Sequence, residues 1–203
     1  RMKYFNSDGR EGTMCGNGGR CIINFAARKN IIRKKTQFIG IDGLHEGIVN
    51  DDGTISIKMI DVSDYKKLND GYLIETGSRH FVKFVDDTDK IDVQNTGEAI
   101  RNETRFGAEG TNANFVKITG NNSLKIRTFE RGVEAETLAC GTGTVAAVIS
   151  AYLEHKADKN SWSIKALGGN LSVSFEKDQD GVFKNVWLRG PAEYVFSGEI
   201  ELT

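Results

Sequence analysis

The sequence predicts an α+β protein of two pseudo-symmetric domains, each a curled, mostly antiparallel sheet around a central helix. Most of the hydrophobic pattern has a period of two, which is typical of half-buried strands. Two longer segments instead carry apolar residues at helical spacing. Each of them follows a Cys-Gly-X-Gly loop, so the chain contains an internal repeat.

The first predicted strands form a hairpin. Asp51-Asp52-Gly53 is a turn signal between the short run Gly47–Asn50 and the alternating run Thr54–Ile60. Seven more runs show the strand pattern, many of them bounded by Gly, Asn or Asp: His80–Val85, Asn114–Thr119, Leu124–Glu130, Ser161–Leu167, Leu171–Glu176, Val182–Arg189 and Glu193–Leu202.

Helices are predicted over Gly18–Asn30 and Thr144–His155, with a shorter one near Gly97–Arg105. Both long segments are nearly apolar around their whole circumference, so we expect each helix to lie inside a sheet layer. The repeat suggests a first domain over residues 1–62, completed by a C-terminal strand at 193–203, and a second over 63–192. The crossing between them is expected around Val62–Asp70, which is polar and lacks a period.

Composition narrows the class of protein. Of the 203 residues 27% are charged and 38% hydrophobic, which is typical of globular proteins. The net charge of −1 does not indicate binding to nucleic acid or to anionic lipid. No apolar run is long enough to cross a bilayer, and no signal-peptide pattern opens the sequence, so we expect a cytoplasmic protein. Three cysteines make no disulfide framework, which turns attention to thiol reactivity.

The two loops Cys15-Gly-Asn-Gly18 and Cys140-Gly-Thr-Gly143 are the candidate chemistry. A glycine-rich helix start leaves backbone N–H groups free and binds anions such as a carboxylate. The same helix start is expected to lower the pKa of each thiol toward neutrality. Two such thiols facing one carbon would form a two-base pair that inverts a stereocentre without a cofactor.

A structural role is the alternative for a cysteine beside glycine at a helix start, but matching loops before both helices favour catalysis. Cys21 lies among apolar neighbours in the first helix, and we assign it to the core. Zinc binding by the three cysteines lacks the close paired spacing of structural zinc sites.

At these loops the sequence resembles the diaminopimelate epimerase family. Asn6-Ser-Asp-Gly9 with Met14-Cys-Gly-Asn-Gly-Gly-Arg-Cys21 resembles the first cysteine signature of the family. Glu130-Arg-Gly132 with Glu136-Thr-Leu-Ala-Cys-Gly-Thr-Gly143 resembles the second. Gly77-Ser-Arg-His-Phe-Val82 and Gly110-Thr-Asn-Ala-Asn-Phe-Val116 match two further blocks in the right order.

The resemblance implies cofactor-independent epimerisation of LL-diaminopimelate to meso-diaminopimelate, in lysine and peptidoglycan precursor biosynthesis, by a homodimer. Cys15 and Cys140 would be catalytic, and Glu130 and His80 would assist proton handling or receive the α-ammonium group. The family positions that bind substrate fall on Asn6, Gly16, Asn17, Asn112, Glu130, Arg131, Gly141 and Thr142. Arg131 can form a bidentate pair with the distal carboxylate.

Two features depart from the family pattern. Ser78-Arg79-His80 stands where the family usually has Asn-Pro-His, so a hydroxyl at Ser78 replaces an amide at the distal end of the substrate. The sequence also opens almost on the first cysteine block, so we expect the leading Gly-Asn-Asp segment to be missing and the first domain to be incomplete. On this expectation the 203-residue chain alone has severely impaired epimerase activity, while the complete protein is active.

Other functions stay open at this point. The nearest rival is a proline or hydroxyproline racemase of the same two-cysteine fold, against which Arg131, Asn6 and Asn112 favour a substrate with a second charged end. A catalytically silent protein that only binds an amino acid is the second alternative. A nucleotide-binding module is disfavoured, because neither common glycine-loop motif follows a strand.

Overall fold

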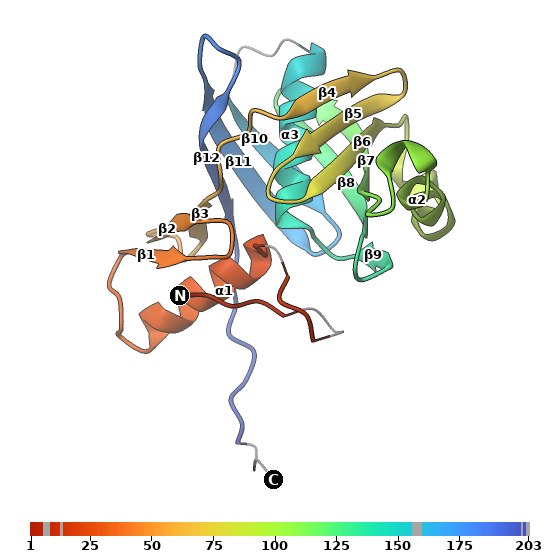
Figure 1. Ribbon diagram of the computed structural model, residues 1–203. Coiled ribbons are helices and arrows are strands. Elements are labelled where there is room, and N and C mark those ends of the chain that lie inside the picture. The colour runs from red at the N-terminus through yellow and green to blue at the C-terminus, as the bar shows by residue number, and fades with distance from the viewer. Residues whose placement is uncertain (6–8, 13, 156–159, 200, 202–203) are drawn as a thin grey trace.

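The computed structural model describes residues 1–5, 9–12, 14–155, 160–199 and 201 (Figure 1). The first part of the chain forms helix α1 (Gly16–Arg28) and an antiparallel meander. Its strands are β1 (Lys35–Ile39), β2 (Leu44–Val49) and β3 (Ile55–Lys58). Gly53 takes φ +82° in the turn before β3, so the predicted hairpin is confirmed.

The rest of the chain builds a larger sheet and two further helices, α2 (Val93–Arg101) and α3 (Gly141–His155). Its strands are β4 (Tyr65–Leu68), β5 (Gly71–Glu75), β6 (Arg79–Phe84), β7 (Asn112–Gly120), β8 (Ser123–Glu130), β9 (Ala135–Thr137), β10 (Ser161–Ala166), β11 (Gly169–Lys177) and β12 (Phe183–Gly190). The six runs predicted between His80 and Arg189 are all strands.

In the described part of the chain the strands form one mixed sheet of twelve, in the order β1-β2-β3-β12-β11-β10-β8-β7-β6-β5-β4, with β9 beside β8. Only β6–β7 and β8–β10 pair in parallel, so the predicted α+β, mostly antiparallel fold is confirmed. The antiparallel pair β3–β12 joins the meander to the larger sheet. The sheet therefore continues across the expected boundary at residue 62, and the division into domains 1–62 and 63–192 stays a prediction.

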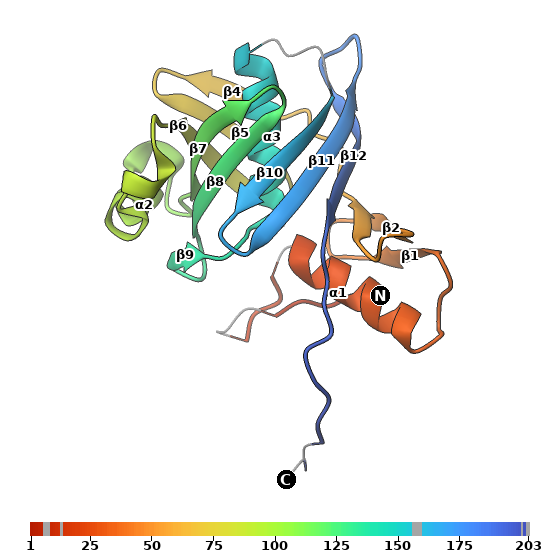
Figure 2. The same ribbon diagram turned by 180° about the vertical axis from the view of Figure 1, so that it is seen from behind.

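Helix α3 lies inside the curl of the larger sheet, as predicted for it (Figures 1 and 2). Every residue from position 141 to 151 is buried, and Val145, Val148 and Ile149 are fully buried in the main core. Small residues such as Ala146 and Ala147 let the strands approach the helix on several sides. This burial fixes the position of the helix start that carries Cys140.

Helix α1 does not match the same prediction. Gly19 and Ile23 pack on β2 and β3, but Ile22 and Phe25 are 39% and 57% exposed, and Cys21 is exposed as well. The assignment of Cys21 to the core was therefore wrong. In the described structure one side of α1 faces the meander and the opposite side faces solvent, because no second sheet layer covers it (Figure 2).

Helix α2 covers the face of the sheet opposite α3 and closes a second core cluster with Phe81, Phe115 and Phe129. It begins at Val93, earlier than the predicted segment near Gly97–Arg105, because the Asp92 side chain accepts a hydrogen bond from the Asn95 N–H and caps the helix. Residues 104–106 form a separate 3₁₀ turn.

Four strands and one terminus differ from the prediction. Strands β1, β4, β5 and β9 are not among the predicted runs, and β4 lies within the segment interpreted as an aperiodic crossing. Its exposed lysines hide the strand pattern, since an edge strand buries little. The strand expected at 193–203 is absent from its described residues, which extend past α1 (Figure 1). The carbonyls of Pro191 and Ala192 accept hydrogen bonds from side chains of α1 instead of pairing with a strand.

Among the described helices, none has the length and apolar character that crossing a membrane requires.

Candidate active site

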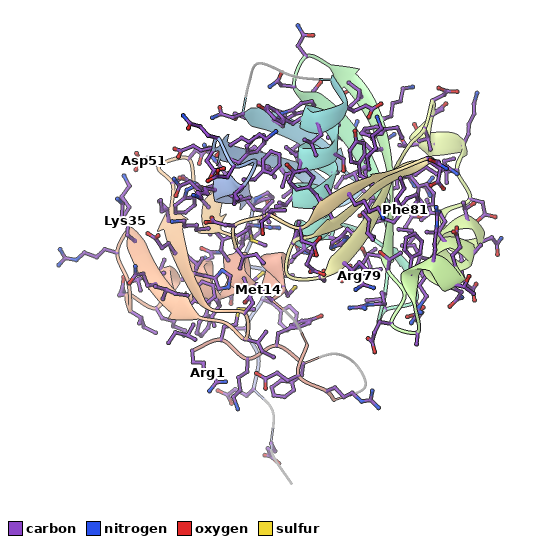
Figure 3. All side chains as sticks on the ribbon, turned by 45° about the horizontal axis from the view of Figure 1, so that its top comes forward. Arg1, Met14, Lys35, Asp51, Arg79 and Phe81 are labelled. Carbon is purple, nitrogen blue, oxygen red and sulfur yellow. The ribbon has the colours of Figure 1, made fainter. Side chains whose placement is uncertain are left out.

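The two cysteine loops meet at the first residues of α1 and α3. A Cβ atom placed on Gly141 would lie 3.0 Å from the Gly16 Cα atom, and one placed on Gly16 would lie 3.2 Å from the Gly141 Cα atom. Leu188 of β12 packs against both glycines. In Figure 3 the labelled Met14, which precedes Cys15, lies at this junction between the meander and the larger sheet. Only residues without a side chain allow the two helix starts to approach so closely.

Cys15 caps the N-terminus of α1 and is half-buried. Its Sγ atom accepts a hydrogen bond from the Gly18 N–H at 3.4 Å. Burial raises the pKa of the Cys15 thiol, while backbone N–H donors at Gly18 and Asn17 oppose that rise. The neighbouring Glu130 carboxylate adds to the rise and Arg20 opposes it.

Cys140 precedes α3 and is buried. Its Sγ atom lies 3.4 Å from the Thr142 hydroxyl oxygen. Burial raises the pKa of Cys140 to about 12, with Glu130 as a further cause. The expectation that the helix starts lower both thiol pKa values is therefore wrong for the free protein, because the loss of water around the thiolate outweighs the N–H donors.

A cavity of about 470 Å³ opens between the loops and contains both cysteines. Its lining includes most of the residues that the sequence predicted for substrate binding: Gly16, Asn17, Asn112, Glu130, Arg131, Gly141 and Thr142. Ser78, a predicted assisting residue, lines it as well. Asn6 lies outside the described residues. A cavity of this size fits an amino acid with a charged group at each end.

The amide side chains of Asn17 and Asn112 already have protein partners. The Asn17 Nδ2 group donates to the Ala139 carbonyl at 2.7 Å, across the junction of the loops. The Asn112 Nδ2 group donates to the Arg79 carbonyl at 2.8 Å, and its Oδ1 atom accepts from the Arg131 N–H at 2.9 Å. Both asparagines therefore hold the walls of the cavity in place.

Glu130 and Arg131 bring both signs of charge to the cavity. The Thr137 hydroxyl donates to the Glu130 carboxylate at 2.9 Å, and burial raises the pKa of that carboxyl. The Arg131 Nη1 group donates to the Glu109 carbonyl at 3.3 Å and lies 3.7 Å from the Glu109 carboxylate. Arg131 remains a partly exposed cation in the lining of the cavity, and a guanidinium can pair with a carboxylate.

His80 lies behind the cavity wall and is fully buried. The Asn114 amide donates to its Nδ1 atom at 3.1 Å, so Nε2 carries the hydrogen, and Nε2 lies 2.9 Å from the Thr142 hydroxyl oxygen. The Ser78 hydroxyl lies 2.9 Å from the same Nε2 atom. Burial and the charge of Arg131 lower the pKa of His80 to about 3, so the ring is neutral and reaches Cys140 only through Thr142.

Sequence reasoning missed three residues of the site. Tyr4 lines the cavity beside Cys15 and Glu130. The Thr76 hydroxyl donates to the Thr142 carbonyl at 3.1 Å and so fixes the start of α3. Arg20 is buried directly behind the Cys15 loop. Of the three, only Arg20 could have been found from the sequence, because it lies in the first cysteine block. Tyr4 and Thr76 are brought to the site by tertiary contacts with residues far away in the chain.

Comparisons with known proteins identify the family. The sequence model described as diaminopimelate epimerase matches residues 72–195. The protein named diaminopimelate epimerase from Flavobacterium psychrophilum is 46% identical over 98% of this chain and 78% of its own length. The protein of the same name from Chlorobaculum tepidum is 40% identical over 100% of this chain and 80% of its own length.

Solved structures share the fold at low identity. A PhzF-family phenazine biosynthesis protein from Bacillus anthracis has a TM-score of 0.77 at 15% identity, covering 100% of this chain and 80% of the other. A hydroxyproline epimerase from Agrobacterium vitis has a TM-score of 0.67 at 11% identity, covering 90% and 66%. The structures support the fold alone, while the identity to the sequence relatives shows that the chain belongs to the diaminopimelate epimerase family.

Proposed function

We propose that this protein interconverts LL- and meso-diaminopimelate, using Cys15 and Cys140 as a two-thiol acid–base pair. The observation that carries the proposal is the meeting of two cysteine-bearing helix starts within one cavity. Family membership supplies the substrate, and an amino-acid epimerase of this kind serves lysine and peptidoglycan precursor biosynthesis.

The helix starts suit the reacting end of the substrate. Free N–H groups at the starts of α1 and α3 can hold the α-carboxylate and stabilise the negative charge that forms as the α-proton leaves. One thiolate takes the proton as the C–H bond breaks and an S–H bond forms. The opposite thiol then gives its proton to the other face of the carbon, which inverts the stereocentre.

The surroundings of the cysteines support an order of ionisation. Cys15 has N–H donors and Arg20 beside it, whereas Cys140 is more deeply buried with a pKa of about 12. We therefore propose that Cys15 is the first thiolate and Cys140 the first acid in the free enzyme. After each turnover the roles are reversed, which lets the same pair act on the other stereoisomer.

The distal end of the substrate is assigned to Arg131, whose guanidinium can pair with the second carboxylate. Glu130 lies near both thiols and is the candidate partner of the α-ammonium group. Asn6, Gly16, Asn17, Asn112, Gly141 and Thr142 complete the proposed binding set, with His80 and Ser78 supporting Thr142 from behind.

Exchange of the α-hydrogen in deuterated water tests this proposal. We expect exchange into LL-diaminopimelate, monitored by NMR, and none into proline. Cys15→Ala and Cys140→Ala should each abolish epimerisation. Exchange that survives both substitutions would exclude the two-thiol mechanism, and faster exchange into proline would favour a proline or hydroxyproline racemase. Binding of diaminopimelate without any exchange would indicate a silent amino-acid-binding protein.

The oligomeric state and the cellular location belong to the same proposal. A homodimer is expected from the family resemblance, and the mass in solution measured by light scattering checks it. All three cysteines are free, and a mechanism that needs reduced thiols fits a reducing compartment. We therefore propose a cytoplasmic location.

A further inference from the structure

Arg20 is a buried cation without an acidic partner in the described structure. Its side chain lies on the first turns of α1 and the residue is only 6% exposed. No carboxylate of the described residues lies within ion-pair distance; burial lowers the pKa of Arg20, and the charges of Cys21 and of Cys15 oppose that change. A buried charge is normally paired because it has lost its water shell, so a group that balances Arg20 is expected nearby.

The guanidinium is held by three neutral acceptors. Nε donates to the Pro191 carbonyl at 3.3 Å, Nη1 to the Gly16 carbonyl at 3.4 Å and Nη2 to the Asn17 Oδ1 atom at 2.9 Å. Gly190 lies beside the guanidinium, since a Cβ atom there would be at contact distance, 3.4 Å, from Arg20 Nε. The arginine is therefore fixed between α1 and the segment after β12.

The bond to Asn17 determines the direction of the Asn17 amide. Since Oδ1 accepts from Arg20, the Nδ2 group points away from it and donates to the Ala139 carbonyl at 2.7 Å. Ala139 directly precedes Cys140. A chain of two hydrogen bonds thus connects Arg20, behind the first cysteine loop, to the backbone of the second.

We propose that Arg20 is a positioning residue of the two-thiol reaction: it orients the Asn17 amide that joins the loops, and its charge is balanced by the Cys15 thiolate. This inference rests on the proposed function. Glu130, Cys140 and Tyr4 lie around Cys15 with Arg20 of its own helix, and the same cavity is lined by further charged residues: Arg10, Glu11, Arg101, Glu109, Arg131 and Glu134. Arg20 is the cation that lowers the pKa of Cys15, so its loss should make the thiolate harder to form.

Alkylation of Cys15 by iodoacetamide as a function of pH measures thiolate formation. We use the full chain with Cys21→Ser, which removes the exposed thiol, and identify the modified cysteine by peptide mass mapping. Arg20→Gln removes the charge, and we expect the Cys15 rate near neutral pH to fall by about tenfold, as for one pKa unit. Arg20→Lys keeps the charge and should retain most of the rate.

A second pair of variants leaves the arginine in place. Asn17→Asp puts a carboxylate at the atom that Arg20 already contacts, so it should neutralise the cation and slow Cys15 alkylation as Arg20→Gln does. Asn17→Ala loses the bond to Ala139 without adding charge and should slow it less. Thermal unfolding of each variant shows that the protein compared is folded.

The outcomes separate the parts of the inference. Unchanged Cys15 profiles in both Arg20→Gln and Asn17→Asp would overturn the charge balance. Equal losses in Arg20→Lys and Arg20→Gln would also overturn it, since geometry alone would then explain the effect. Alkylation needs no turnover, so failure of the α-hydrogen exchange assay leaves this measurement intact and identifies the proposed function as the part that failed.

Discussion

Cys15 and Cys140 hold equivalent positions before their helices, but their surroundings differ. Cys15 is half-buried, with an N–H donor at 3.4 Å, whereas Cys140 is buried and has the Thr142 hydroxyl beside it. His80 Nε2 lies 2.9 Å from both the Thr142 and the Ser78 hydroxyl oxygens, and these two oxygens lie 3.3 Å apart. The hydrogen bond between Thr142 and Cys140 favours the Cys140 thiolate, and the buried, neutral histidine holds Thr142 in place beside it.

Substitution of Thr142 tests this arrangement at the residue level. Thr142→Val keeps the shape but removes the donor, so the pKa of Cys140 should rise further. We expect kcat to fall about tenfold, the effect of losing about 1.4 kcal/mol of charge stabilisation. Thr142→Ser is the control and should retain most of the rate. Equal kcat values for Val and wild type would show that the hydroxyl does not act on Cys140.

Helix α2 shows how an element is fitted to the sheet. Gly97 is unfavourable in the middle of a helix, yet a Cβ atom there would lie 2.3 Å from Phe129 Cβ. The glycine therefore lets α2 pack directly on the Phe129 side chain in the second core cluster. The helix also lies against β8, whose last residue is Glu130 of the site.

Gly97→Ala is expected to destabilise the protein even though alanine is the better helix former. The added methyl group overpacks the contact with Phe129 and should lower the free energy of unfolding by about 1–3 kcal/mol. Glu98→Ala, on the exposed side of the same helix, is the matched control and should change it little. Urea unfolding measures both. A Gly97→Ala protein as stable as the control would contradict the close packing.

The whole molecule is organised around α3, whose start places Cys140 and Thr142 against the fully buried His80 of β6. The folded protein keeps His80 neutral with a pKa of about 3, against 6.5 for a free histidine. The unfolded chain therefore binds one more proton below about pH 6.5, so stability from this group is present above that pH and is lost as the pH falls.

The pH dependence of unfolding checks this linkage. Between about pH 6 and pH 5 His80 should lower the free energy of unfolding by about 1.4 kcal/mol for each pH unit. His80→Asn removes that slope, although the variant is less stable overall because Asn114 and Thr142 lose their partner. Both proteins share the other titrating groups, so the difference between the two slopes of unfolding free energy against pH reports on His80 alone. Parallel curves for the two proteins would show that His80 is not held neutral.

Much of the fold could be predicted from local pattern. The period-two runs are strands β6, β7, β8, β10, β11 and β12, and the apolar segment before His155 is a buried helix, because burial on one or all sides leaves a direct trace in sequence. Edge strand β4 and the extended residues after Gly190 could not be predicted. Their conformation depends on which neighbour offers hydrogen bonds, and that neighbour lies far away in the chain.

The candidate chemistry is visible in the amino-acid sequence, since two Cys-Gly-X-Gly loops before helices form a repeat, and nearly all the residues predicted around them line one cavity. The ionisation and exposure of those residues depend instead on how the chain packs. Burial raises the thiol pKa values that helix starts alone would lower, α1 exposes Cys21, and Arg20 stands without a carboxylate. Local sequence specifies donors and acceptors, but the water that each charged group loses depends on the packing of the whole chain.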